Sequence, residues 1–102
     1  MDKIYDIIRD CTGFNWDKYN INKNWEKHNV TPVESEQVFF NNPFIITADI
    51  KHTKVESRYY ALGKTDRGRK LFIAFTIRNS KIRVISSRDM SKKERDEYEQ
   101  HN

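Results

Sequence analysis

Two neighbouring segments, residues 70–78 and 81–88, constrain the fold most, because apolar and polar side chains alternate along both of them. A period of two residues is typical of β-strands that bury one face and expose the other. Asn79 and Ser80 separate the two segments and suit a tight two-residue turn. The sequence therefore predicts an antiparallel β-hairpin with a core side and a polar side.

The two-residue turn fixes which side chains share a face of this hairpin. Phe75 is expected opposite Val84 on the apolar face, and Thr76 opposite Arg83 on the polar, cationic face. Strict alternation would place Arg88 on the apolar side. The sequence therefore predicts either a bulge before Arg88 or a position for this residue past the edge of the sheet.

Helix-start signals and apolar runs predict the elements around the hairpin. Thr31 and Ser91 each precede a glutamate by three positions, and these capping boxes mark the starts of two helices. Asp17 suits the N-cap of another helix that runs to about His28, and residues 2–10 have the apolar spacing of a short helix. Further strands are expected at residues 14–16, 44–47 and 57–64.

The helical patterns also predict which side chains face inward. In the helix at residues 17–28 these are Ile21, Asn24, Trp25 and His28. The next helix carries Val33, Gln37, Val38 and Phe40 and ends before Asn41-Asn42-Pro43. Two roles stay open for Asn24 and His28, namely buried polar groups with hydrogen-bond partners or a direct part in catalysis. The sequence thus predicts an α+β fold, with two N-terminal helices packed on an antiparallel β-sheet of about four strands and a C-terminal helix.

Positive charge is concentrated in the strand-rich part of the chain. The net charge of all 102 residues is only +4, but residues 51–88 hold 11 Lys and Arg against 2 Asp and Glu, which is +9. Residues 1–50 hold 5 basic and 8 acidic residues, which is −3. A basic segment of this kind favours a polyanion or an acidic protein as partner, against the alternative of an ordinary solvated surface.

Other residue types narrow the class of protein. Cys11 is the only cysteine, and no apolar run reaches the roughly 20 residues of a membrane helix. We therefore expect a cytoplasmic protein without disulfides that does not contact a membrane. The histidines and the cysteine lack metal-ligand spacing, and the glycines form no phosphate-binding loop, so neither a metal nor another cofactor is expected.

A series of short motifs resembles one known family of toxins. The motifs are Phe14-Asn15-Trp16-Asp17, Lys27-His28, Val38-Phe39, Phe75-Thr76 and Ile82-Arg83-Val84-Ile85-Ser86, with Asn24, His52, Glu56, Arg58, Gly63, Arg69, Arg78, Arg88, Glu94-Arg95 and Tyr98 at compatible spacing. Over residues 14–98 the chain resembles the BrnT toxins of BrnT/BrnA type II toxin–antitoxin modules. Residues 1–13 lie outside the resemblance, so we expect an N-terminal extension at 1–13 and a single toxin domain at 14–102.

The resemblance implies a RelE-like ribonuclease fold and RNA cleavage that inhibits translation and growth. It also implies neutralisation by BrnA, a DNA-binding ribbon-helix-helix antitoxin, so the expected partners are an RNA substrate and this antitoxin. A second hypothesis requires no catalysis. In that hypothesis the chain is a basic module that binds nucleic acid or an acidic partner protein through the same face.

Metal-independent RNA cleavage uses the 2′-hydroxyl of the substrate as nucleophile, so the protein must supply a base, an acid and cations. His52 and Glu56 form the best acid–base pair, with either assignment of roles open, unless Glu56 simply pairs with Arg58 or Arg83. Arg58 and Arg83 are the predicted catalytic cations, because a guanidinium offers a bidentate fork to a phosphate. Further candidates are Arg78, Arg88 and Lys54 for RNA phosphates, with His28 and Tyr60 as auxiliary residues.

Overall fold

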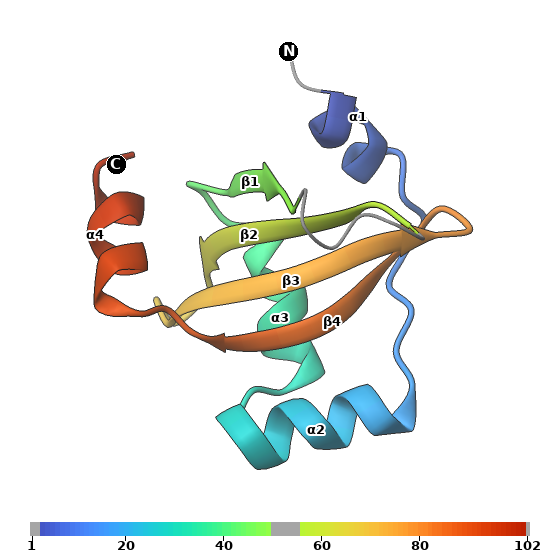
Figure 1. Cartoon of the computed structure of the whole chain (residues 1–102), viewed down its shortest axis with the longest axis horizontal. Helices are drawn as coiled ribbons and strands as arrows, with labels where there is room; N and C mark the ends of the chain where they lie inside the picture. Colours follow the sequence, from blue (N-terminus) through green and yellow to red (C-terminus); the bar gives the residue numbers. More distant parts are fainter. Residues whose placement is uncertain (1–2, 50–55, 102) are drawn as a thin grey trace.

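The computed structural model of the chain describes residues 3–49 and 56–101. Within these residues, three helices are followed by four strands and a last helix, as labelled in Figure 1. Their bounds are α1 Lys3–Arg9, α2 Lys18–His28, α3 Pro32–Val38, β1 Ile45–Ala48, β2 Arg58–Lys64, β3 Lys70–Arg78, β4 Lys81–Asp89 and α4 Lys92–Glu99. Among the residues described, no helix is long and apolar enough to cross a membrane.

The strands form one antiparallel sheet in the order β1-β2-β3-β4, which confirms the predicted α+β class. The predicted hairpin register is also confirmed, because Thr76 of β3 lies opposite Arg83 of β4. Asn79 and Ser80 have φ angles of 51° and 61°, as a type I′ turn requires of both central residues. The RelE-like label that the family resemblance implies stays a prediction.

A bulge in β4 changes which side chains face the core. The pairing with β3 shifts between Ala74 and Phe75, and Ile85 is left as the extra residue on β4. Beyond the bulge, Ser87 is buried on the core side and Arg88 points to the opposite face. The bulge is therefore the correct one of the two alternatives that the sequence leaves for Arg88.

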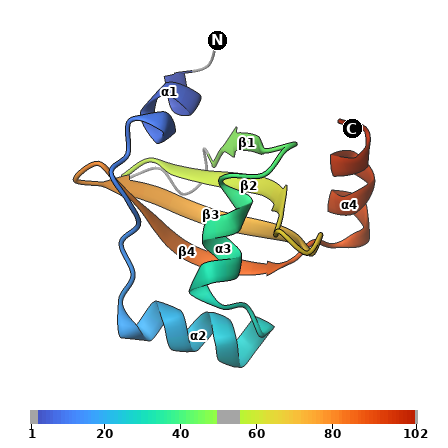
Figure 2. The ribbon, with the colours of Figure 1, turned by 180° about the vertical axis from the view of Figure 1, so that it is seen from behind.

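One face of the sheet is covered by helices and the other is largely open. Helix α3 lies behind the sheet in Figure 1 and in front of it in Figure 2, and α2 runs beside β4. The core under these helices contains Val30, Val38, Ala61, Leu71, Ile73, Phe75, Ile82 and Val84. The opposite side, here called the open face, carries Arg58, Tyr60, Leu62, Phe72, Ala74, Thr76, Arg83, Ser86 and Arg88.

The inward side of α2 differs from the prediction. Trp25 is 53% exposed, and the buried residues of this helix are Asn20 and Asn24. Asn20 donates a hydrogen bond to the carbonyl of Val84 (3.3 Å), and the Oδ1 atom of Asn24 accepts one from the backbone N–H of Ser87 (3.2 Å). Amides are buried here because they satisfy backbone groups of β4, which an indole cannot do in this way. The inward position of Trp25 was wrongly predicted. Burial of Asn24 is confirmed, and its Oδ1 atom has a partner, whereas its Nδ2 atom is buried without one among the described residues.

Helix α3 buries only part of its apolar residues. Val33 is 62% exposed, and Phe40, just beyond the helix, is 76% exposed. Val38 is buried and packs on Gly63 of β2, where an added Cβ atom would come within 2.5 Å of Val38 Cγ1. Glycine at this position therefore permits the close approach of α3 to the sheet.

The C-terminal helix is fixed to the sheet by one aromatic side chain. Ser91 caps α4 in the predicted capping box. Tyr98 is 1% exposed, packs with Leu62 and Met90, and donates its hydroxyl to the carbonyl of Pro43 (2.6 Å). This small second core places α4 at one end of the open face.

Side chains bind the backbone along both outer strands of the sheet. Along β4, Lys23 Nζ donates to the carbonyl of Ile85 (2.7 Å), beside the asparagine contacts from the same helix. Along β1, the hydroxyl of Tyr5 donates to the carbonyl of Phe44 (3.3 Å) and accepts from the N–H of Ile46 (3.2 Å). Helix α1 is thereby attached to β1, and the division of the chain at residue 13 stays a prediction.

Candidate functional site

Three strands contribute neighbouring side chains to the centre of the open face. Arg58 of β2 pairs with Thr76 of β3, and Thr76 pairs with Arg83 of β4. Paired residues of antiparallel strands point to the same face, so these three residues form a row across the sheet, here called the arginine row. Thr76 is buried and donates its hydroxyl to the carbonyl of Ser57 (2.6 Å). The backbones of the two arginines are therefore about 10 Å apart, with one strand between them.

Arg83 is held in the row by the segment that precedes α2. Its guanidinium forms an ion pair with Asp17 and donates a hydrogen bond to Asn15 Oδ1 (3.3 Å). Asp17 also caps α2, because its Oδ1 atom accepts from the backbone N–H of Asn20 (2.8 Å). The hydrogen bonds from Arg83 and Asn20 hold the pKa of Asp17 below its usual value. Sequence reasoning found the cap but missed the ion pair, since no local pattern links positions 66 residues apart.

Glu56 lies beside the arginine row in a bidentate ion pair with Arg78. The two contacts are Nη2···Oε1 at 2.6 Å and Nε···Oε2 at 2.9 Å. The hydrogen bond from Arg78, with the positive charges of Arg58 and Arg83, holds the pKa of Glu56 below its usual value. The structure thus brings Glu56 together with three predicted site arginines, and its partner is Arg78 rather than Arg58 or Arg83.

Tyr60 follows Arg58 on the open face, and its ring gives this face an aromatic surface. Its ring packs against Phe72 with centroids 4.9 Å apart. A hydrogen bond with Asp49, together with burial, raises the pKa of Tyr60, so the phenol stays protonated at neutral pH. The neighbouring Tyr59 instead packs in the core, so only Tyr60 of this pair lies on the open face.

Arg88 connects the open face to α4. It forms a bidentate ion pair with Glu94 (2.8 and 2.9 Å), and its guanidinium lies 4.1 Å from the centre of the Phe72 ring. The ion pair adds to Tyr98 in holding α4 against the sheet, and the contact with Phe72 orients Arg88 for it. The predicted binding of an RNA phosphate by Arg88 stays a prediction.

Lys23 adds a cation that sequence reasoning did not assign to the site. Besides its bond to the bulge carbonyl, burial and the positive charges of Lys27 and Arg58 lower its pKa. The spacing of lysines along α2 does not predict the contact of Lys23 with the carbonyl of Ile85, because this contact depends on the bulge in β4.

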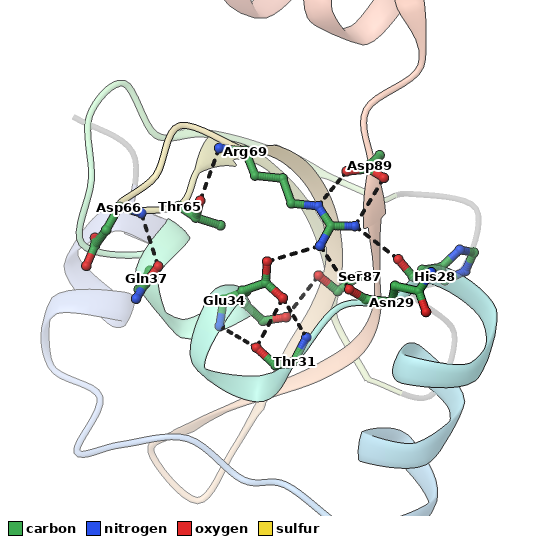
Figure 3. A network of polar contacts seen from close by, with 11 residues as sticks. His28, Asn29, Thr31, Glu34, Gln37, Thr65, Asp66, Arg69, Ser87 and Asp89 are labelled. Atoms are coloured by element: carbon green, nitrogen blue, oxygen red, sulfur yellow. Dashed lines mark hydrogen bonds and ion pairs between the residues drawn. The ribbon is translucent and has the colours of Figure 1, made fainter.

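Arg69 organises a second polar cluster, which Figure 3 shows from close by. Its guanidinium donates to both carboxylate oxygens of Asp89 (2.7 and 3.1 Å), to Glu34 (3.0 Å), and to the carbonyls of His28 (3.0 Å) and Asn29 (2.9 Å). One side chain thereby joins the end of α2, the start of α3 and the end of β4. The hydrogen bonds of this cluster hold segments of the fold together, and the cluster includes none of the residues of the arginine row.

His28 belongs to this second cluster rather than to the arginine row. It contributes its carbonyl, while its imidazole points away from the guanidinium in Figure 3. Helix α2 has 11 residues, so its ends are about 16 Å apart, with Asp17 and its Arg83 partner at the far end. The structure therefore does not bring the predicted auxiliary residue His28 to the other site residues.

Two predicted site residues are not placed by the structure. His52, the predicted partner of Glu56, and Lys54, a predicted phosphate-binding residue, lie outside the described residues. Both assignments stay predictions.

Comparison with protein families tests the resemblance found in the sequence. The family model for the BrnT ribonuclease toxin of type II toxin–antitoxin systems matches residues 16–94. The chain belongs to the BrnT family. Membership makes it a ribonuclease toxin, with RNA as substrate and an antitoxin protein as partner. A search of curated proteins finds no match. The matched range of the BrnT toxin includes the arginine row, Glu56 and Tyr60, whereas α1 lies outside it.

Proposed function

We propose that this BrnT toxin cleaves RNA on the open face of its sheet without a metal ion, and that it acts on cytoplasmic RNA to inhibit translation. The 2′-hydroxyl of the substrate attacks the adjacent phosphate, and the 5′-oxygen leaves. The protein must then supply a base for the hydroxyl proton, cations for the charge on the phosphate, and an acid for the leaving oxygen.

The arginine row is the observation that supports this proposal. Arg58 and Arg83 flank one strand on the same face, where two guanidinium groups bracket a position for a phosphate. Asp17 and Asn15 hold Arg83 in a fixed orientation, so little side-chain entropy is lost when a phosphate binds. In this proposal the scissile phosphate lies between Arg58 and Arg83, above Thr76.

Glu56 is the proposed base. An ionised glutamate can accept a proton at neutral pH, although the hydrogen bond from Arg78 lowers the pKa of Glu56 and so makes it a weaker base than a free glutamate. Its ion pair with Arg78 orients the carboxylate beside the row. His52 is the proposed acid, because an imidazole titrates near neutral pH and His52 precedes Glu56 by only four residues.

The antitoxin is proposed to be a BrnA-like ribbon-helix-helix protein that covers the same face. An inhibitor of a cationic site is expected to present acidic or apolar groups to it, over a buried area of about 1,200–2,000 Å² or more. A complex that leaves the arginine row open to solvent would contradict this proposal.

The central experiment measures RNA cleavage by the purified, antitoxin-free toxin in EDTA. We expect cleavage by the wild type and a loss of about 100-fold in Arg83→Gln, because the phosphate loses one of its two cations. Arg67→Gln is the matched control, since it removes the same charge from the exposed turn between β2 and β3. The control is expected to cleave RNA within about twofold of the wild type.

Two results would contradict the proposal. Wild-type toxin that leaves RNA intact in EDTA beside a working nuclease would exclude metal-independent cleavage. The non-catalytic alternative is tested by Glu56→Gln, which keeps the shape of the side chain and removes the base. If Glu56→Gln still inhibits growth as strongly as the wild type, the toxin acts by binding alone.

A further inference from the structure

A small pocket lies on the open face between the arginine row and α4. Its volume is about 220 Å³, and its lining includes Thr47, Tyr60, Leu62, Phe72, Glu94 and Glu97. The strands thus supply an apolar and aromatic floor, and α4 supplies two carboxylates at the rim. None of the proposed phosphate chemistry uses this pocket.

Along β2, the pocket begins at the open-face residue next to the arginine row. Tyr60 follows Arg58 by two residues on the same face of β2, which corresponds to about 7 Å along the strand. A nucleotide whose phosphate lies in the arginine row therefore has its base, or that of its neighbour, within reach of Tyr60. The pocket volume is large enough for a purine, and its aromatic floor offers a stacking surface.

The two carboxylates at the rim differ in their partners. Both oxygens of Glu94 bind Arg88, and one also accepts from the backbone N–H of Ser91. Within the described residues, the carboxylate of Glu97 makes no hydrogen bond or ion pair, and the side chain is exposed. Of the two carboxylates, Glu97 is therefore the one whose oxygens both remain available to a ligand.

We propose that this pocket binds the guanine base of a nucleotide adjoining the scissile phosphate, with the base stacked on Tyr60 and its donor edge bound by Glu97. The inference rests on the proposed RNA cleavage and adds a base preference to it. A carboxylate accepts hydrogen bonds and donates none when ionised. The Watson–Crick edge of guanine presents two adjacent donors, N1–H and N2–H₂, which match the two oxygens.

The other bases fit this carboxylate less well. Adenine and cytosine each present one amino donor beside an acceptor nitrogen, which a carboxylate repels. Uracil presents a single N3–H donor between two carbonyl oxygens. Because unmatched acceptors would face the charge of Glu97, guanine is the base that this rim selects.

The experiment measures both cleavage and binding, so that it does not depend on cleavage alone. Cleavage is measured as kcat/KM on RNA oligonucleotides that differ only in the two nucleotides at the cleaved bond. Binding is measured by NMR titration with the four nucleoside 5′-monophosphates. We expect the wild type to favour guanine at one of the two positions by about tenfold, and to bind GMP about tenfold more tightly than UMP.

Glu97→Gln is expected to reduce both preferences to less than about threefold, with little change for the other bases. Asp96→Asn is the matched control, since it removes the same charge from the same helix at a residue paired with Lys92 outside the pocket. The control should keep both preferences. Tyr60→Leu should weaken binding of all four monophosphates by about tenfold through loss of stacking.

The outcomes separate this inference from the proposed function. Cleavage without a guanine preference, together with equal binding of GMP and UMP, would overturn the guanine pocket and leave the ribonuclease proposal intact. Preferences that survive Glu97→Gln unchanged would overturn it as well. Selective GMP binding that Glu97→Gln abolishes, in a toxin that leaves RNA intact, would support the pocket and contradict the proposed cleavage.

Discussion

Arg69, just before β3, and Arg83, in β4, are the same residue type, and they differ in how many hydrogen bonds their surroundings form with them. Arg69 donates to two carboxylates and two carbonyls from separate segments, so its hydrogen-bonding capacity is nearly filled. Arg83 binds Asp17 and Asn15 on one side, beside the open face. The filled hydrogen-bonding capacity of Arg69 indicates a structural role. The contacts of Arg83 with Asp17 and Asn15 fix the orientation of its guanidinium in the arginine row.

The same distinction applies to the other arginines of the site. Arg78 and Arg88 each form a bidentate pair with one glutamate, Glu56 and Glu94 respectively. A phosphate would have to compete with these carboxylates. Arg83 is also paired with a carboxylate, that of Asp17, and its side chain is 17% exposed against 49% for Arg78. What distinguishes Arg83 is its place opposite Thr76, in the same row as Arg58.

The largest expected effect on stability is that of Arg69→Gln. Its removal leaves Glu34 and Asp89 without a cation and leaves two carbonyls without a donor. We expect a loss of about 3 kcal/mol in the free energy of unfolding, measured by urea titration with Arg67→Gln as control. A loss below about 1 kcal/mol would show that the cluster is not the structural centre described here. Arg83→Gln should cost less than Arg69→Gln in the same titration.

A smaller effect is expected at Asp17, where capping and arginine positioning are combined in one carboxylate. Asp17→Ala removes both and is expected to cost about 1 kcal/mol, whereas Asp17→Ser keeps a capping oxygen and should cost less than about 0.5 kcal/mol. Both variants should cleave RNA more slowly, since Arg83 loses its carboxylate partner. If Asp17→Ser cleaves RNA at the wild-type rate, Asp17 acts only as a helix cap.

The smallest effect concerns acid pH. Hydrogen bonds from Arg69 hold the pKa of Asp89 below its usual value; at Glu34 burial opposes the shift, but bonds from Thr31 and Arg69 outweigh it. The unfolded chain therefore binds more protons than the folded one at acid pH, and stability falls as the pH drops below about 4.5.

This dependence is expected to be weaker in Arg69→Gln. The stability difference between Arg69→Gln and the wild type should shrink by less than about 1 kcal/mol from pH 6 to pH 3, because both carboxylates are partly exposed. Urea titrations across this range measure the difference. A difference that widens toward pH 3 would mean that the two carboxylates do not depend on Arg69.

Local signals in the sequence predicted most of the fold. The alternation of β3 and β4, the turn at Asn79 and Ser80, and the capping residues of three helices were each confirmed. These signals succeed because hydrogen bonds within a few residues determine them. Even the bulge before Arg88 was one of the two predicted solutions.

Contacts between distant segments were the part that the sequence did not predict. Trp25 was assigned inward from apolar periodicity, but the interface of α2 with β4 requires amide groups for backbone partners, so Asn20 and Asn24 are buried there. The ion pair of Asp17 with Arg83 depends on the same docking of α2. Apolar periodicity carries no information about which backbone groups the partner element leaves unsatisfied.

Charge along the sequence also overstated the charge on the open face. Residues 51–88 have a net charge of +9, but acidic side chains from outside that segment pair with some of its arginines. Asp17 binds Arg83, and Glu94 binds Arg88. The face is therefore partly neutralised in the folded protein. A count of charges along the chain predicts the sign of the surface better than its magnitude.

The side chains that bind the outer strands have a consequence for how this toxin assembles. Backbone groups of β4 are taken by α2, and those of β1 by the hydroxyl of Tyr5. At these positions another polypeptide cannot prolong the sheet unless it first displaces these groups, which protects the molecule from polymerising strand by strand. An antitoxin that binds without displacing these groups contacts side chains of the toxin at these positions. It can then dissociate without unfolding the toxin.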